Sequence, residues 1–184
     1  TTKNKKFGTN GTVTAGVGTG RFLRYNSGVS INHRKNKLSL NSGIDYMHNA
    51  QYYDNQSTRF IADGSVITED EYEVRQRNNY SFRLGIDYDI NKTTTAGFLA
   101  KGFMNFRDRE VENNAIANKL LPLSDSSSLV STKGYARFAS PSLNMYFKKV
   151  LDTTGKEITF NADYLRYLKK WNDDFTTDFY DGNK

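Results

Sequence analysis

Histidine and cysteine, the residues most often used for metal binding and nucleophilic catalysis, are scarce in this chain. The sequence has two histidines and no cysteine, so disulfides, zinc–thiolate sites and cysteine nucleophiles are excluded. His33 lies near a tight turn and His48 lies many residues along the next segment, so we do not expect them to share a metal ion. Neither histidine is accompanied by a nucleophile elbow. We therefore expect no enzyme activity, no bound metal and no cofactor.

Glycines and acidic clusters offer two further candidate sites. Gly16, Gly18 and Gly20 are spaced as in a phosphate-binding loop, but no helical pattern follows them to supply an N-terminal dipole. A bend between two strands is the favoured interpretation. Residues 69–71 and 173–174 are acidic and could bind calcium, yet the EF-hand spacing is missing. Solvated loop charge is favoured there.

A third candidate site combines cationic and aromatic side chains in long polar segments. Its residues are Arg59, Phe60, Tyr72 and Trp171. Ligand-binding residues are often carried on loops. We expect these four to lie in loops and to gather a ligand.

Alternating hydrophobicity predicts the elements that carry these residues. Between residues 80 and 90 every even position is apolar or aromatic, whereas the odd positions carry serine, arginine, glycine and aspartate. The same alternation recurs in 23–32, 38–46, 95–106, 143–148 and 158–164, and more weakly in 12–17. A period of two is the signature of β-strands. The sequence therefore predicts an all-β fold of about seven long strands in an antiparallel up-and-down meander.

The alternation also predicts a sheet with two unlike faces. The polar face is expected to present Asp45, Arg83, Asp87, Lys101 and Asp163. The apolar face is expected to present Leu38, Leu40, Ile44, Phe82, Leu84, Ile86, Phe98 and Phe160.

The predicted connections alternate in length. Residues 34–37, 89–92 and 152–156 are short polar turns, whereas 54–77 and 108–133 are long polar connections and 169–184 begins a third. Short turns on one rim and long loops on the other are typical of outer-membrane barrels, in which a lipid-facing arginine at midplane costs about 2–4 kcal/mol. The pattern favours an apolar face in lipid and a polar face in a wet lumen.

Aromatic residues where strands leave the apolar band fit this interpretation. They are Tyr25, Tyr46, Tyr80, Tyr88 and Tyr164. Amphipathic rings at headgroup level form an aromatic girdle. Aromatics also favour strands in general, so each tyrosine fits either explanation.

Charge and hydropathy exclude two other classes. The net charge of +6 is spread over turns and strand ends, without the basic, aromatic-lined groove that nucleic-acid binding requires. No run of eighteen apolar residues occurs, which excludes a transmembrane helix. We therefore expect no nucleic-acid partner.

Several short motifs follow one another in a fixed order. They are Thr2-Lys3-Asn4-Lys5-Lys6 with Gly8, Gly11 and Gly16-Val17-Gly18; residues 24–34 and 37–40; residues 83–88; and residues 155–164. In this order they resemble the barrel of TonB-dependent receptors, from the junction with the plug through the first hairpins, over nearly the whole chain. His33 stands where tyrosine is common in that family.

The resemblance implies a domain organisation and partners. Residues 1–7 would end the plug or junction, and 8–184 would form the first strands of a large transmembrane barrel of about 22 strands. The partners would be membrane lipid, the plug and remaining strands of the same receptor, and a TonB-type energy-coupling protein acting through the plug. The implied location is the cell outer membrane, and the imported nutrient is not specified. Transport would not belong to this segment alone.

Strand direction gives a separate reason to expect more chain. In a seven-strand meander the first and last strands run in the same direction, so they cannot pair antiparallel and close a barrel. Bacterial single-chain barrels have even strand numbers.

The rival hypothesis is a soluble antiparallel β-sandwich that serves as a carbohydrate-binding or adhesion module, with its apolar face buried against a second sheet.

Overall fold

The computed structural model describes residues 7–119 and 124–181, and the described chain is built from strands. Its strands are β1 (Gly8–Gly18), β2 (Arg24–Lys35), β3 (Leu38–Phe60), β4 (Val66–Asp89), β5 (Thr94–Lys119), β6 (Ser124–Val150), β7 (Glu157–Leu165) and β8 (Leu168–Asp181). No helix long and apolar enough to cross a membrane occurs in the described residues. The predicted all-β class is confirmed.

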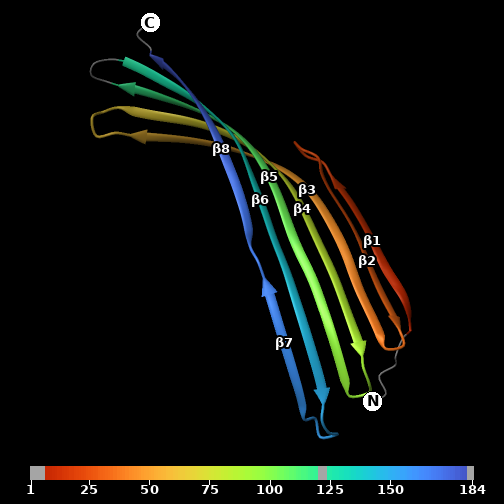
Figure 1. Ribbon diagram of the computed structural model, residues 1–184. Helices are drawn as coiled ribbons and strands as arrows, with labels where there is room; N and C mark the ends of the chain where they lie inside the picture. Colours follow the sequence, from red (N-terminus) through yellow and green to blue (C-terminus); the bar gives the residue numbers. More distant parts are fainter. Residues whose placement is uncertain (1–6, 120–123, 182–184) are drawn as a thin grey trace. The chain divides into compact units, whose positions relative to one another are not determined.

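The strands form one antiparallel up-and-down sheet in the order β1-β2-β3-β4-β5-β6-β7 (Figure 1), and β8 also pairs with β6. This sheet is not closed, because β1 and β7 do not pair. The predicted seventh strand is present as two segments, β7 and β8. At the interruption the Arg166 amide donates to the Pro141 carbonyl over 3.1 Å. Pro141 has no amide hydrogen with which to continue the ladder.

The chain divides into two compact units, which are described separately. The first unit comprises Thr1–His48, Asn78–Asn105 and Arg137–Lys169, and the second comprises Asn49–Arg77, Phe106–Ala136 and Lys170–Lys184.

In the first unit the predicted tight turns are confirmed. β2 and β3 are joined through Asn36, whose φ of 54° is a left-handed conformation that asparagine tolerates. β4 and β5 are joined by a turn in which the Asn91 amide donates to the Thr94 carbonyl over 3.3 Å. In the β6–β7 turn, Asp152 accepts hydrogen bonds from the amides of Thr154 (2.9 Å) and Lys156 (3.1 Å).

In the second unit the predicted long loops are wrong. β3 continues to Phe60 and β4 begins at Val66, so only 61–65 form the connection, closed by a 2.8 Å bond from the Ile61 amide to the Ser65 carbonyl. The pairing continues because polar side chains meet across the strands, for example Asn55 and Glu71 at 3.1 Å. Loss of apolar alternation marked the end of the hydrophobic face, not the end of the strands.

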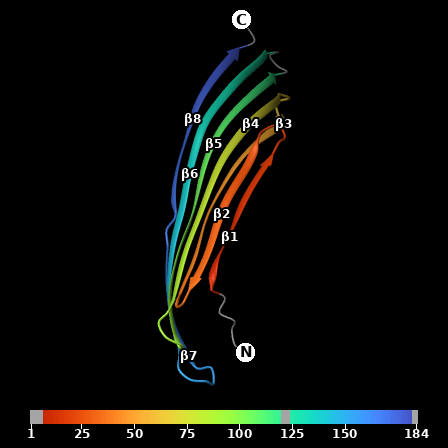
Figure 2. The ribbon, with the colours of Figure 1, turned by 90° about the vertical axis from the view of Figure 1, so that its right-hand side faces the viewer.

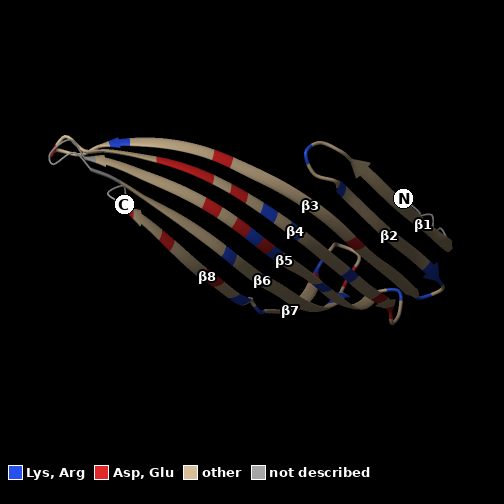
Figure 3. Cartoon of the chain, turned by 90° about the horizontal axis from the view of Figure 1, so that it is seen from above, with Lys and Arg blue, Asp and Glu red and all other residues tan. Residues whose placement is uncertain are grey.

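Three predicted loops are therefore strand segments. β5 extends to Lys119 and β6 begins at Ser124, and most of 169–184 belongs to β8. All four residues expected in ligand-gathering loops consequently lie in strands: Arg59 and Phe60 in β3, Tyr72 in β4 and Trp171 in β8. Charged residues accordingly lie along the strands as well as in the turns (Figure 3).

Burial differs between the units. The buried apolar residues Ala50, Val111 and Ala136 all belong to the second unit. In the first unit the strands form a single layer (Figure 2). Large apolar side chains there stay open, such as Ile44 at 67% and Phe160 at 63% exposure. The first unit therefore has no hydrophobic core among its described residues.

Candidate functional site

Strand register defines the apolar face of the first unit. Val13 on β1 is opposite Val29 on β2, which is opposite Ile44 on β3. Tyr46, on the same face of β3, donates a 2.8 Å hydrogen bond to Asn78, which places the even positions of β4 on this face. Leu38, Leu40, Phe82, Leu84 and Ile86 thus share the face with Ile44.

The same face continues over β5 to β7. Gly102 lies against the ring of Phe82, so the even positions of β5, including Phe98, belong to it. On β6 and β7 Phe147 is opposite Phe160. Across 25–33, 38–48, 78–88, 94–104, 139–147 and 158–164 this face has no aspartate, glutamate, lysine or arginine. All eight residues predicted for an apolar face are therefore on one side of the sheet.

An aromatic and amide cluster lies at the end of the apolar face where β3 leaves the first unit. Tyr25 stacks on His48 with ring centroids 4.8 Å apart, and Tyr46 approaches Tyr80 at 4.9 Å. Asn78 accepts from Tyr46 and lies 2.9 Å from His48 Nδ1. Tyr46 and His48 thus combine an apolar ring with a polar atom held by Asn78.

The other two predicted girdle residues lie elsewhere on this face. Tyr88 is near the opposite end of β4, and Tyr164 is directly opposite Leu143 on β6. His33, the other histidine, contacts Thr9 Oγ1 at 2.7 Å and does not approach His48. No group of three histidines or carboxylates placed to hold a metal is present in the described residues.

The opposite face of the first unit is polar. Asp45, Asp87 and Asp163 accept hydrogen bonds from Ser81 (3.3 Å), Tyr146 (2.8 Å) and Asn144 (2.7 Å), respectively. Arg83 and Lys101 share this face. All five residues predicted for the polar face are therefore on the same side, and each of the three carboxylates has a neutral donor from another strand.

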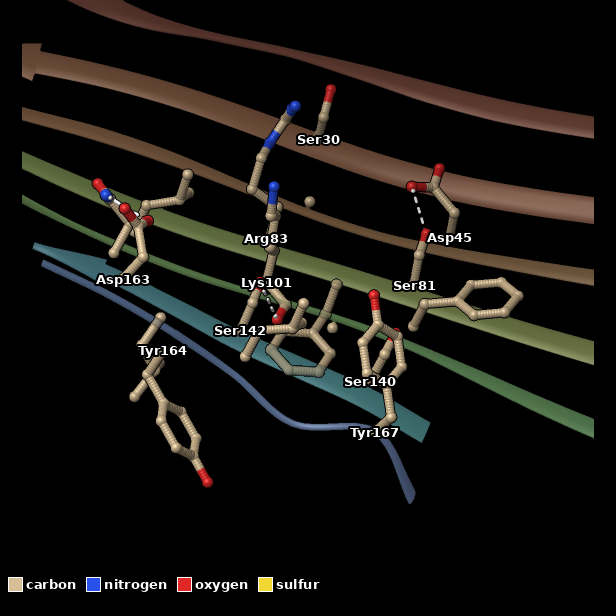
Figure 4. A pocket seen from close by; sticks show the side chains of 18 residues that line it. Ser30, Asp45, Ser81, Arg83, Lys101, Ser140, Ser142, Asp163, Tyr164 and Tyr167 are labelled. Atoms are coloured by element: carbon tan, nitrogen blue, oxygen red, sulfur yellow. Dashed lines mark hydrogen bonds between the residues drawn. The ribbon is translucent and has the colours of Figure 1, made fainter. Parts of the chain in front are cut away.

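A hollow of about 920 Å³ lies on this polar face. Small residues on successive strands, including Ser30, Gly43 and Ser142, leave the space open. Arg83 and Lys101 extend from neighbouring strands in the same direction, whereas Tyr164 points to the other side of the sheet (Figure 4). The hollow is therefore lined by two cationic side chains and by small residues of the neighbouring strands.

An aromatic wall, formed by Phe103, Phe138 and Tyr167, lies beside these cations. Phe103 and Phe138 have ring centroids 6.2 Å apart, and Phe138 and Tyr167 are stacked at 6.0 Å. Sequence reasoning missed this wall. The sequence does contain a sign of it. Phe103 and the nearby Leu99 are apolar residues at odd positions of β5, where the alternation otherwise predicts polar side chains.

In the second unit the four predicted ligand-gathering residues are not one cluster. Arg59 forms an ion pair with Glu69 at 2.5 Å, and Tyr72 lies 6.2 Å from Tyr52 between ring centroids. Phe60 is 82% exposed beside the β3–β4 turn, while Trp171 lies on β8, whose partner is β6. These residues are spread across the strands.

Polar pairs dominate the electrostatics of the second unit. The hydrogen bond from Arg59 holds the pKa of Glu69 below its usual range. Arg109 donates to Asp173 at 3.1 Å. Arg75 forms an ion pair with Glu73, which raises the pKa of Arg75. Glu69 and Asp173, from the two predicted acidic clusters, are therefore each bonded to an arginine of another strand.

Fold and faces together define a class: an open, all-β antiparallel meander with one charge-free face and one charged, hollowed face. In comparison with known proteins, no family model matches the chain, and no curated protein matches it.

Proposed function

We propose that this chain is part of the wall of a transmembrane β-barrel in the outer membrane, belonging to a TonB-dependent receptor that imports a nutrient. The observation that supports the proposal most is the face of the first unit that has no charged residue over its strand interiors. Soluble monomers rarely expose large contiguous apolar patches, and a lipid-facing surface removes that difficulty.

The backbone supports the same proposal. In hydrocarbon every backbone polar group needs a partner, and closed barrels achieve this between strands. β1 and β7 are the edges of the described sheet, and exposed edges promote aggregation. In the proposed barrel further strands pair with both edges.

The receptor assignment depends on the motif resemblance. Under that assignment a separate plug occupies the lumen, and a TonB-type protein acts on the plug from the periplasm. The chain would have a structural and binding role without catalysis. Arg59, Phe60, Tyr72 and Trp171 would contact ligand from the strands that carry them.

Paired substitutions on adjacent positions of β4 test the membrane-facing assignment. We expect Phe82→Arg to prevent assembly into outer membranes, because a lipid-facing arginine costs about 2–4 kcal/mol at midplane. Arg83→Ser, one residue away on the polar face, should assemble normally. Assembly is measured by membrane fractionation of the whole protein and by resistance of the folded form to protease.

Equal loss of assembly in both variants would contradict the face assignment. A wild-type protein that remains monomeric in water without detergent would instead favour the β-sandwich, whose apolar face is buried by a second sheet.

A further inference from the structure

Arg83 and Lys101 are directly opposite each other across β4 and β5. Thr95 donates to Asp89 over 3.0 Å and Asn105 donates to Asn79 over 2.5 Å. In an antiparallel pair, equal steps along both strands from either of these contacts lead to another opposite pair. Such steps from Asp89 and Thr95, or from Asn79 and Asn105, place Arg83 opposite Lys101. Like charges directly opposite in a sheet are destabilising. A negative charge bound between Arg83 and Lys101 would therefore stabilise this pair.

The described residues of the chain supply no carboxylate that pairs directly with either cation. Neither the Arg83 guanidinium nor the Lys101 ammonium has a hydrogen-bond or ion-pair partner among them. Two carboxylates line the same hollow, but Asp45 is bonded to Ser81 and Asp163 to Asn144. Both cations project freely into the hollow (Figure 4).

The arrangement of donors suits an oxyanion. A guanidinium donates two parallel hydrogen bonds to a carboxylate, and an ammonium adds a compact second charge. The hydroxyls of Ser30 and Ser142 line the same space. The Ser142 hydroxyl donates only a long, weak hydrogen bond of 3.4 Å to the Lys101 carbonyl.

The aromatic wall sets the shape of the rest of the ligand. Phe103 follows Lys101 by two positions on the same face, which is about 7 Å along a strand. Tyr167 closes the wall from the link between β7 and β8 and lines the hollow with Phe103. Flat rings pack well on aromatic side chains.

We propose that the hollow binds a small organic anion in which a carboxylate and a flat ring are separated by a short linker. The carboxylate lies between Arg83 and Lys101, and the ring lies against Phe103 and Tyr167. All four residues belong to the polar face of the first unit, so the site does not depend on what covers the apolar face.

Calorimetric titration of the whole, folded protein with 3-phenylpropionate tests this site. We expect binding of 3-phenylpropionate, and much weaker binding of 3-phenylpropanol, which keeps the ring without the charge. Arg83→Gln and Lys101→Met should each weaken binding about tenfold or more, as loss of a charge-assisted hydrogen bond does. Lys92→Met, in the β4–β5 turn, removes the same charge outside the hollow and should leave affinity unchanged.

The aromatic wall is tested by Tyr167→Ala, which should weaken 3-phenylpropionate binding and leave the weaker binding of propionate unaltered. Circular dichroism of each variant checks that the strands are retained. Absence of 3-phenylpropionate binding to wild type overturns the proposal, as does equal binding of the alcohol or an equal effect of Lys92→Met. Normal assembly of Phe82→Arg would overturn the membrane assignment and leave this result intact, because the titration uses the wild-type polar face and needs no lipid.

Discussion

Tyr146 reaches across the polar face because its neighbour on β5 is a glycine. A Cβ placed on Gly97 would overlap the Tyr146 ring and come within 2.6 Å of an Asp87 carboxylate oxygen. The absent side chain therefore makes room for the 2.8 Å hydrogen bond from Tyr146 to Asp87. An aromatic ring covering a glycine on the next strand is a recognised way to fix register.

Gly97→Ala should therefore destabilise the folded protein. The added methyl group displaces the Tyr146 ring and breaks its bond to Asp87, and overpacking of this kind costs about 1–3 kcal/mol. Gly18→Ala is the matched control, because a Cβ there meets nothing within 4 Å, and we expect a change within about 0.5 kcal/mol. Urea unfolding curves of the two variants measure the difference, and equal midpoints would argue against the close approach.

At the scale of elements, alternation identified the strands of the first unit and its tight turns but not the outer strand ends. Apolar alternation reports which side of a strand avoids water, so it stops where both sides are polar, as it does beyond Asn49. Backbone pairing continues there through side-chain pairs such as Arg59 and Glu69. Phe103 and Tyr167 were missed for a related reason, because the approach of each ring to Phe138 depends on how the strands are aligned.

The end of the β3–β4 hairpin should loosen in acid. The bond from Arg59 lowers the folded-state pKa of Glu69 below its unfolded value of about 4.3. A lowered pKa gives stabilisation that is complete above the unfolded value and is lost as pH falls through the folded value. We expect an unchanged hairpin from pH 7 to about 5 and loosening below about pH 4.

Amide chemical shifts of Ile61 and Ser65, whose backbone bond closes this turn, measure the transition. Glu69→Gln keeps the shape of the side chain and removes the titrating group, so its shifts should not move over the same pH range. Movement of the same size in Glu69→Gln would assign the effect to another group.

At the scale of the molecule, the exposed charge-free face of the first unit determines which environment suits the sheet. Exposed side chains of the size of Ile44 and Phe160 gain about 25 cal/mol for each Å² removed from water. In the proposed barrel, lipid would provide this transfer along the whole face at once, whereas the charged face would keep its water. A tryptophan placed on each face distinguishes the two environments directly.

Phe82→Trp and Arg83→Trp, each made with Trp171→Phe so that one tryptophan remains, should differ sharply in lipid vesicles. We expect strong quenching of the Phe82→Trp fluorescence by lipids brominated on their acyl chains, because that ring would lie in hydrocarbon. The Arg83→Trp ring, on the opposite face of the same strand, should be quenched by aqueous acrylamide or shielded from both quenchers. If brominated lipid quenches both rings, the sheet does not separate lipid from lumen. If brominated lipid quenches neither ring, the membrane-facing assignment is wrong.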